Sequence, residues 1–446
     1  MKSTGETSNT TEKEQKLPVT EKNGTAPEKT EHILNRLIIG AGVCVAVIAV
    51  LIGVKLYRQD RQMDITEPFA RSMVLASDPL SAEKRFQAET LSADLCVGET
   101  SVPLNDISFS SQVKAGLFDL DHKKVLFAQN MYDQVYPASI TKIMTALLAM
   151  EYNQPDTQVT ITEEDLALED GSQMSGLAVG DTVTMDQLFH ALLIYSANDA
   201  AMAIARQVGG SVENFVQMMN DKAAELGCVN THFNNPHGLS EGEDATLHYT
   251  CCYDMALIAK AAYQNETFRV ITSTKTYQIP PTNKHDEITY LQNHNEMIHA
   301  FKTRGQYLYE YCVGGKTGYT TAANSTLVTY AEKDDMTLIC VIMNAQSPAQ
   351  WTDSIALYNY YFENFSLYNV AQNETRLENG EMDMGMLNTN SSFVKIDPAG
   401  NIVLPKSAEF SEATPAVSYD NTSDDVLANI KYTFAGHDVG LSLIHI

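Results

Sequence analysis

The chain has 446 residues, 44% of them hydrophobic and 19% charged, so it can bury one or two sizeable cores and is not disordered throughout. Its 56 acidic residues outnumber 30 basic ones, giving a formal net charge of -26 without a basic patch, which argues against a nucleic-acid-binding protein. Because such a surface repels anions at long range, a site for an anionic ligand needs lysines or arginines of its own.

The N-terminal part of the chain is predicted to hold a membrane anchor. Residues 1–36 are polar and balanced in charge, which predicts a disordered tail. Residues 37–54, LIIGAGVCVAVIAVLIGV, carry no charge and are long enough to cross a bilayer as a helix. A buried soluble helix would have nothing to pack against, and no cleavage site for a signal peptide follows. We therefore expect a single transmembrane signal anchor over 37–54, then a polar stalk over 55–104. Basic residues on both sides of the anchor leave its orientation open.

The first elements of the folded part are a hairpin and two helices. Apolar runs at 113–120 and 125–128 predict a β-hairpin. Apolar residues at helical spacing predict a helix over 139–152. The sequence TMDQ at 184–187 is a capping-box pattern that starts a second helix, which breaks near Ser196 and resumes.

Three strand-like runs and a closing helix follow. The runs are residues 307–320, 325–333 and 336–345, and the helix is expected over 351–365. The pattern predicts an α/β (α+β) domain over 105–366, in which helices flank an antiparallel sheet.

Short alternating segments, such as SFVKI, NIVLP and NIKYTF, predict a small C-terminal β domain over 367–440. The chain ends in LSLIHI at 441–446, which resembles a translated adapter read. We therefore expect these six residues to be non-native and the β domain to be truncated.

Seven cysteines show neither CxxC pairs nor zinc spacing, so no metal or other cofactor is expected. His248 with Cys251 and Cys252 is the nearest approach to a metal cluster. The simpler interpretation is small buried thiols at the start of a helix.

Four Ser-x-x-Lys sequences occur, so the motif alone has little value. They are Ser81 with Lys84, Ser111 with Lys114, Ser139 with Lys142, and Ser392 with Lys395. Only Ser139 starts a strongly apolar helix and is followed by further motifs. Residues three apart share a helix face, so Lys142 can direct its amine at the Ser139 hydroxyl and act as its base.

Two further motifs follow in order: Ser196-Ala197-Asn198 at the helix break and Lys316-Thr317-Gly318 on a strand. A buried lysine beside another cation loses part of its affinity for a proton, as a lysine base requires. His237 in NPHGL is expected to be a turn residue, and Asp199 a helix cap.

Taken together, YPASITK, YSAND and GGKTGYT resemble the three motifs of the penicilloyl-serine transferases, whose fold is β-lactamase-like. With the flanking segments and THFNNPHGLSE, residues 105–365 resemble the low-molecular-mass penicillin-binding proteins. These are serine-type D-Ala-D-Ala carboxypeptidases of peptidase family S11, and the resemblance continues loosely to about residue 440.

The resemblance implies roles for the first two motifs. Ser139 would form the acyl-enzyme and Lys142 would take its proton. Ser196 would relay a proton to the departing D-alanine, and Asn198 would hold Lys142 and the substrate amide.

For the third motif, the resemblance implies that Lys316 and Thr317 bind the terminal carboxylate and that Gly318 permits close approach of the substrate. The backbone N–H groups of Ser139 and Tyr319 would form the oxyanion hole. The implied partners are peptidoglycan stem peptides that end in D-Ala-D-Ala, and β-lactams as inhibitors. The catalytic domain would then lie on the cell-wall side of the membrane and the tail would be cytoplasmic.

Three other functions compete with this interpretation. A class A β-lactamase needs a deacylating glutamate in an E-x-x-L-N-like segment, and residues 225–250 hold none. A non-catalytic β-lactam or muropeptide sensor would need a signalling segment, and residues 1–36 do not resemble one. A transpeptidase or endopeptidase on the same scaffold stays open, because acceptor choice depends on the shape of the cleft.

Overall fold

The structure is a computed structural model, and it describes residues 109–120, 124–239, 245–377, 395–419, 426–435 and 437–445. The predicted tail, the transmembrane anchor at 37–54 and the stalk lie outside these residues. Within the described part of the chain, no helix combines the length and apolar character needed to cross a bilayer.

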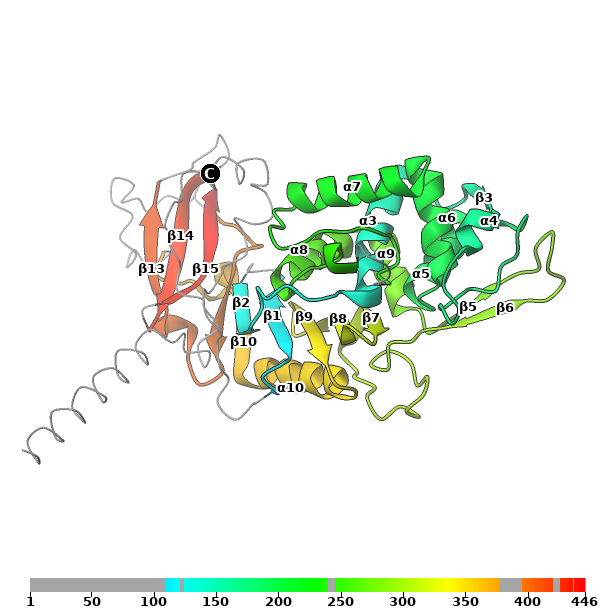
Figure 1. Cartoon of the computed structure of the whole chain (residues 1–446). Coiled ribbons are helices and arrows are strands. Elements are labelled where there is room, and N and C mark those ends of the chain that lie inside the picture. The colour runs from blue at the N-terminus through cyan, green and yellow to red at the C-terminus, as the bar shows by residue number, and fades with distance from the viewer. Residues whose placement is uncertain are drawn as a thin grey trace, which may run out of the picture. The chain divides into compact units, whose positions relative to one another are not determined.

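A five-stranded antiparallel sheet lies at the centre of the part of the chain from residue 109 to residue 364 (Figure 1). Its order is β2-β1-β9-β8-β7. The strands are β1 (Lys114–Asp119), β2 (Lys124–Gln129), β7 (Cys312–Thr320), β8 (Asn324–Lys333) and β9 (Met336–Ala345). β8 and β9 are buried along almost their whole length, which explains why their sequences read as continuous apolar runs rather than alternating ones.

Helices cover both faces of this sheet. Figure 1 shows α10 (Ala349–Asn364) on one side and the other helices between residues 138 and 273 on the opposite side. Those helices are η2 (Ala138–Thr141), α3 (Lys142–Tyr152), α4 (Glu163–Leu166), α5 (Met185–Leu193), α6 (Asn198–Gly209), α7 (Val212–Glu225), η3 (Ala245–Leu247), α8 (Cys252–Tyr263) and α9 (Glu266–Ser273). The prediction of an antiparallel sheet flanked by helices is confirmed.

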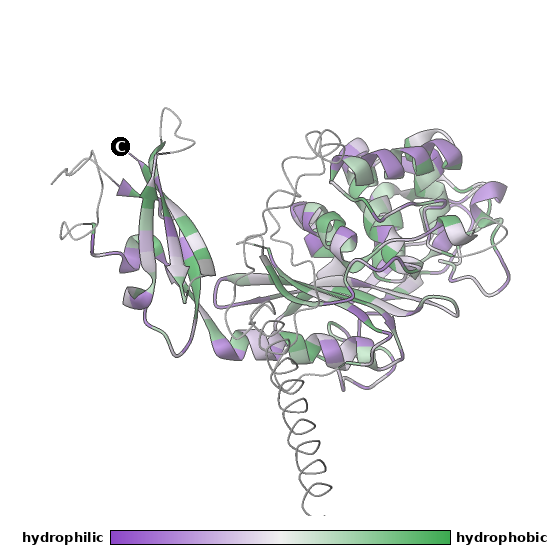
Figure 2. Ribbon diagram, turned by 60° about the vertical axis from the view of Figure 1, so that its left-hand side comes forward, coloured by the Kyte–Doolittle hydropathy of each residue, from purple (hydrophilic) through white to green (hydrophobic). Residues whose placement is uncertain are grey.

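The hydrophobic core lies between these layers. α3 is buried from Lys142 to Ala149, and Figure 2 shows hydrophilic residues on the outward sides of the surrounding helices. A helix that is apolar on all sides needs such a central position. Two short hairpins complete this part: β3 (Gln158–Thr160) with β4 (Thr182–Thr184), and β5 (Thr276–Ile279) with β6 (Thr289–Gln292).

The predicted helix starts agree with the structure except for the one predicted at residue 139. Thr184 caps α5 and shares a capping box with Gln187, as the sequence indicates. The helix predicted over 139–152 instead begins as the short 3-10 helix η2 and becomes α-helical at Lys142. The break near Ser196 is real, and Ser196 adopts a left-handed φ of 65° between α5 and α6.

The C-terminal residues form a second antiparallel sheet with its own core. Its main order is β10-β12-β15-β14-β13, and β11 also pairs with β15. The elements are β10 (Phe365–Asn369), α11 (Val370–Asn373), β11 (Lys395–Ile396), β12 (Asn401–Pro405), η5 (Phe410–Glu412), β13 (Thr414–Ser418), β14 (Val426–Phe434) and β15 (His437–His445). Residues 441–445 belong to β15, while the non-native origin expected for 441–446 stays a prediction.

Candidate active site

Ser139 lies in η2, directly before α3. The first residue of α3 is Lys142, and its side chain points back toward Ser139. Ala138 adopts a left-handed φ of 51°, and the Ser139 side chain is half-buried. The Lys142 ammonium nitrogen Nζ lies 2.9 Å from Ser139 Oγ. The Ser-x-x-Lys spacing therefore brings the two side chains together as predicted.

Lys142 is fully buried and reaches three oxygen acceptors. Besides Ser139, its Nζ donates to Asn198 Oδ1 and to the backbone carbonyl of His237, both at 2.7 Å. Burial lowers the pKa of Lys142 well below its usual value, and the charge of Lys316 lowers it further. The carboxylate of Asp199 opposes this shift. Lys142 can therefore hold an unprotonated amine beside the serine hydroxyl.

Lys316 brings the other two motifs together. It lies on β7, which is an edge strand of the described sheet, and its Nζ donates to Ser196 Oγ at 2.9 Å. A second hydrogen bond runs to the carbonyl of Thr317 at 2.7 Å. Burial lowers the pKa of Lys316 to about 7. Two lysines thus occupy one buried site, each paired with a serine.

Gly318 is required by the closeness of β7 to η2. A Cβ at this position would lie 2.3 Å from Thr326 Oγ1 and 2.8 Å from the backbone nitrogen of Ser139. Thr326 itself donates to the carbonyl of Pro137 at 2.8 Å. The glycine therefore allows strand backbone to touch the segment that carries the serine. Thr317 is half-buried beside it, and Tyr319 has 68% of its surface exposed.

The loop with NPHGL contributes backbone to the site, which sequence reasoning missed. The carbonyl of His237 binds Lys142, whereas its ring nitrogen Nδ1 accepts the N–H of Leu239 at 3.1 Å. Gly238 has a φ of +90°, and a Cβ there would lie 1.9 Å from the Ala138 carbonyl oxygen. The His-Gly pair indicates a turn in the sequence. The residues that this turn contacts, Lys142 and Ala138, lie about a hundred positions earlier in the chain, so the sequence does not show the contact.

His248 connects the same loop to η2 through hydrogen bonds. Asn234 N–H donates to its Nδ1 at 3.1 Å, so Nε2 carries the proton and donates to Thr141 Oγ1 at 2.9 Å. The Thr141 hydroxyl donates in turn to the carbonyl of Ala138 at 2.9 Å. Burial lowers the pKa values of His237 and His248 to about 3, which keeps both rings neutral.

The cysteines lie where the simpler interpretation placed them. Cys251 caps α8, Cys252 is its first residue, and both are buried. The two ring nitrogens of His248 are hydrogen-bonded to Asn234 and Thr141. Over the described ranges, no three His, Cys, Asp or Glu side chains are grouped so that they could hold a metal ion.

The site therefore contains a serine in contact with one buried lysine, and a second buried lysine placed separately. Buried Asn198 fixes the first lysine, and Ser196 connects to the second. Such an arrangement suits acyl transfer to serine from a substrate that carries an anionic group next to the scissile bond.

Comparisons with known proteins agree with this chemistry. Residues 102–347 match the family model Peptidase S11, D-alanyl-D-alanine carboxypeptidase. The carboxypeptidase DacF of Bacillus subtilis is 35% identical over 272 residues, which are 59% of this chain and 66% of DacF. The carboxypeptidase DacB2 of Mycobacterium tuberculosis is 30% identical over 266 residues, 59% of this chain and 85% of that protein.

Solved structures show the same fold. The Streptomyces K15 DD-transpeptidase matches with a TM-score of 0.52 and 28% identity, over 58% of this chain and 100% of that chain. A D-alanyl-D-alanine carboxypeptidase from Mycobacterium tuberculosis matches with a TM-score of 0.52 and 29% identity, over 59% of this chain and 95% of that one. On this evidence, the chain belongs to the peptidase S11 family of D-alanyl-D-alanine carboxypeptidases.

Proposed function

We propose that the protein is a serine-type D-Ala-D-Ala carboxypeptidase that removes the terminal D-alanine from peptidoglycan stem pentapeptides. The observation that carries this proposal is the contact of buried Lys142 with Ser139, 2.9 Å from Nζ to Oγ, together with the lowered pKa of that lysine. A serine hydroxyl needs such a base to attack a peptide carbonyl.

In the first half of the reaction, Ser139 Oγ attacks the carbonyl of the penultimate D-alanine and its proton passes to Lys142. The backbone N–H groups of Ser139 and Tyr319 stabilise the oxyanion. When the C–N bond breaks, the departing D-alanine takes a proton through Ser196, whose hydroxyl contacts Lys316. The product is an ester between Ser139 and the shortened peptide.

The terminal carboxylate of the substrate binds Lys316 and Thr317. The net charge of -26 makes a local cation necessary, and buried Lys316 supplies it. A bound carboxylate also favours the protonated lysine. Water then hydrolyses the ester and regenerates the serine. β-Lactams acylate the same serine, and residues 225–250 hold no E-x-x-L-N-like segment of the kind that carries a deacylating glutamate, which supports a long-lived adduct.

The test is release of D-alanine from a diacyl-L-Lys-D-Ala-D-Ala peptide by the full chain purified in detergent. Ser139→Ala should abolish both release and labelling by a fluorescent penicillin. Ser111→Ala is the matched control, because Ser111 is an exposed serine of another Ser-x-x-Lys sequence and should leave both unchanged. Folded protein that binds penicillin covalently without releasing D-alanine would contradict the proposal.

A second candidate is transpeptidation, because the structurally similar Streptomyces K15 protein is a DD-transpeptidase. The same acyl-enzyme would then be captured by an amine instead of water. Adding an acceptor amine such as glycylglycine to the assay distinguishes the two reactions, since the carboxypeptidase gives mainly the hydrolysed peptide. Dominant aminolysis at millimolar acceptor would favour the transpeptidase.

We also propose that residues 37–54 anchor the chain, with the catalytic part on the cell-wall side and the tail in the cytoplasm. The support is the uncharged apolar run in the sequence and the location of the substrate. In spheroplasts, external protease should digest the catalytic part and spare an epitope placed in residues 1–36. Digestion of that epitope in intact spheroplasts would contradict this topology.

A further inference from the structure

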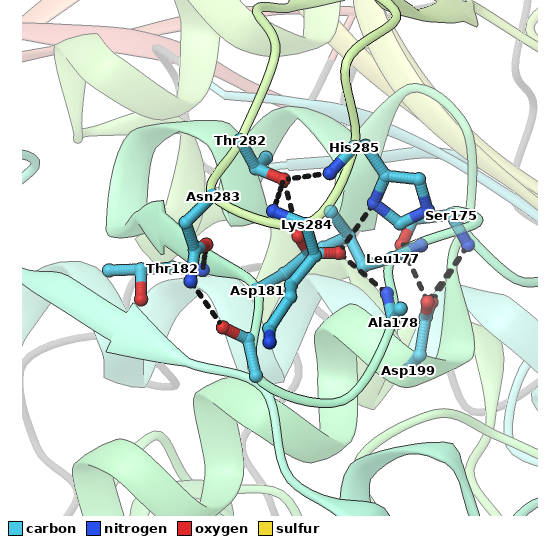
Figure 3. Close-up of polar contacts among 11 residues, drawn as sticks. Ser175, Leu177, Ala178, Asp181, Thr182, Asp199, Thr282, Asn283, Lys284 and His285 are labelled. Carbon is cyan, nitrogen blue, oxygen red and sulfur yellow. Dashed lines mark hydrogen bonds and ion pairs between the residues drawn. The ribbon is translucent and has the colours of Figure 1, made fainter.

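The turn between β5 and β6 contacts a loop that is about a hundred residues away in sequence. Figure 3 shows Thr282 and His285 directed at Asp181. His285 Nδ1 lies 2.7 Å from Asp181 Oδ2, and the Thr282 hydroxyl donates to Asp181 Oδ1. Asn283 between them accepts the N–H of Thr182 at 2.8 Å and donates to the Gly180 carbonyl at 2.7 Å.

The carboxylate of Asp181 makes these contacts from a buried position. Its side chain is fully buried, and its Oδ2 also accepts the N–H of Ala178 at 2.6 Å. Burial by itself raises the pKa of this carboxyl, but the hydrogen bonds from Ala178 and Thr282 and the charge of His285 lower it overall. A buried carboxylate that loses these donors is costly, so the turn and the loop hold each other.

The other end of the same loop is fixed to the start of α6. Ser175 donates through its N–H to both oxygens of Asp199, at 2.9 and 3.0 Å, and through its hydroxyl at 2.5 Å. The carbonyl of Gln173 accepts the N–H of Asn198 at 2.7 Å. Residues 173–181 therefore join the β5–β6 turn to the residue that holds Lys142.

The chain of hydrogen bonds ends at Lys142, the proposed base. Asn198 Oδ1 accepts a hydrogen bond from Lys142 Nζ at 2.7 Å, and the charge of Asp199 raises the pKa of that lysine. A shift of the loop would move Asn198 and Asp199 together, since both are bound to it. The amine that must take the serine proton would then lose its alignment.

We propose that the contact of Thr282, Asn283 and His285 with residues 180–182 positions the active site. Asp181 and His285 are positioning residues: they act through the loop of residues 173–181 on Asn198, and so on Lys142. They touch neither substrate nor reacting atoms. This inference rests on the proposed function, because acylation of Ser139 is the step that it affects.

The test is the second-order rate constant for acylation by a fluorescent penicillin, measured on the full chain in detergent. His285→Ala combined with Thr282→Val should lower it on the order of tenfold, because a misplacement of about 1 Å near the chemistry costs up to about a hundredfold. For D-alanine release, kcat should fall while KM changes less than about twofold, since Lys316 is not displaced.

Two control variants separate positioning from general loosening. His285→Asn keeps an N–H donor near the position of Nδ1 and should restore most of the rate. Tyr290→Ser changes an exposed residue of β6 in the same hairpin and should leave the rate unchanged. Thermal unfolding of each variant shows whether the chain is still folded, because the double variant removes two partners of the buried Asp181 carboxylate.

The inference is overturned if the double variant acylates within about twofold of the unaltered chain, or if Tyr290→Ser loses as much as the double variant does. Equal loss in His285→Asn and His285→Ala would also overturn it. Failure of the proposed function has a different signature, since the unaltered chain itself would then release no D-alanine.

Discussion

Gly318→Ala should separate the position of the serine from the stability of the fold. A Cβ at this position meets Ser139 N at 2.8 Å, while ordinary contact begins at 3.4 Å, so the backbone of the serine must move by about 0.6 Å. Since about 1 Å of misplacement can cost a hundredfold, we expect acylation by penicillin to slow on the order of tenfold. Thr326 must also rotate away from Pro137, and the overpacking should cost about 1–3 kcal/mol of stability.

The matched control is Gly314→Ala on the same strand. Its Cβ would also meet a threonine hydroxyl, Thr272 Oγ1 at 2.6 Å, but no backbone of the serine segment is among its nearest neighbours. Both variants should lose similar stability in thermal or urea unfolding, and only Gly318→Ala should lose acylation rate. Equal acylation by the two variants would refute the idea that Gly318 is needed for the close approach of β7 to Ser139.

Four further outcomes follow from the same geometry. The pH profile of kcat/KM for D-alanine release should be bell-shaped, with an alkaline limb near pH 7 where Lys316 loses its proton, and that limb should move to higher pH in kcat because bound carboxylate stabilises the ammonium. Asn198→Asp should place a second carboxylate beside Lys142 and raise its pKa, so stopped-flow acylation should slow at least about tenfold at pH 7 and recover at higher pH. Gly238→Ala should cost about 2–5 kcal/mol in urea unfolding, from left-handed backbone strain and overlap with Ala138; a loss below about 1 kcal/mol would contradict the packing. His237 and His248 are neutral when folded and charge when unfolded, so stability is complete above pH 6.5 and falls by about 1.4 kcal/mol per pH unit for each ring between pH 6.5 and 3; calorimetry that shows a flat response from pH 6.5 to 5 would contradict their burial.

The sequence by itself distinguished one of the four Ser-x-x-Lys sequences from the others. Ser139 alone precedes a long apolar run, and α3 is accordingly buried at the centre of the fold. Residues three apart must share a helix face, so the contact of Lys142 with Ser139 follows from local geometry. The capping box at Thr184 and the break at Ser196 are local signals of the same kind, and the structure contains both.

Only the tertiary structure decided what else surrounds Lys142. The carbonyl of His237 has no side-chain signature, because any residue offers the same backbone oxygen. The sequence indicates that Gly238 is a turn glycine. A side chain is excluded there because the Ala138 carbonyl, on a segment distant in sequence, lies against it. The lowered pKa of Lys316 likewise arises from burial, which depends on how layers pack rather than on the neighbours along the strand.

The contact of His285 with Asp181 is the clearest example of a pairing that the sequence does not predict. Each residue reads as an ordinary polar side chain in a loop, and about a hundred positions separate them. Hydrophobic periodicity and caps act over a few residues, so they determine elements and the motifs carried on them. Pairings between loops depend on where the completed sheet and helices place those loops, and that information exists only in the folded chain.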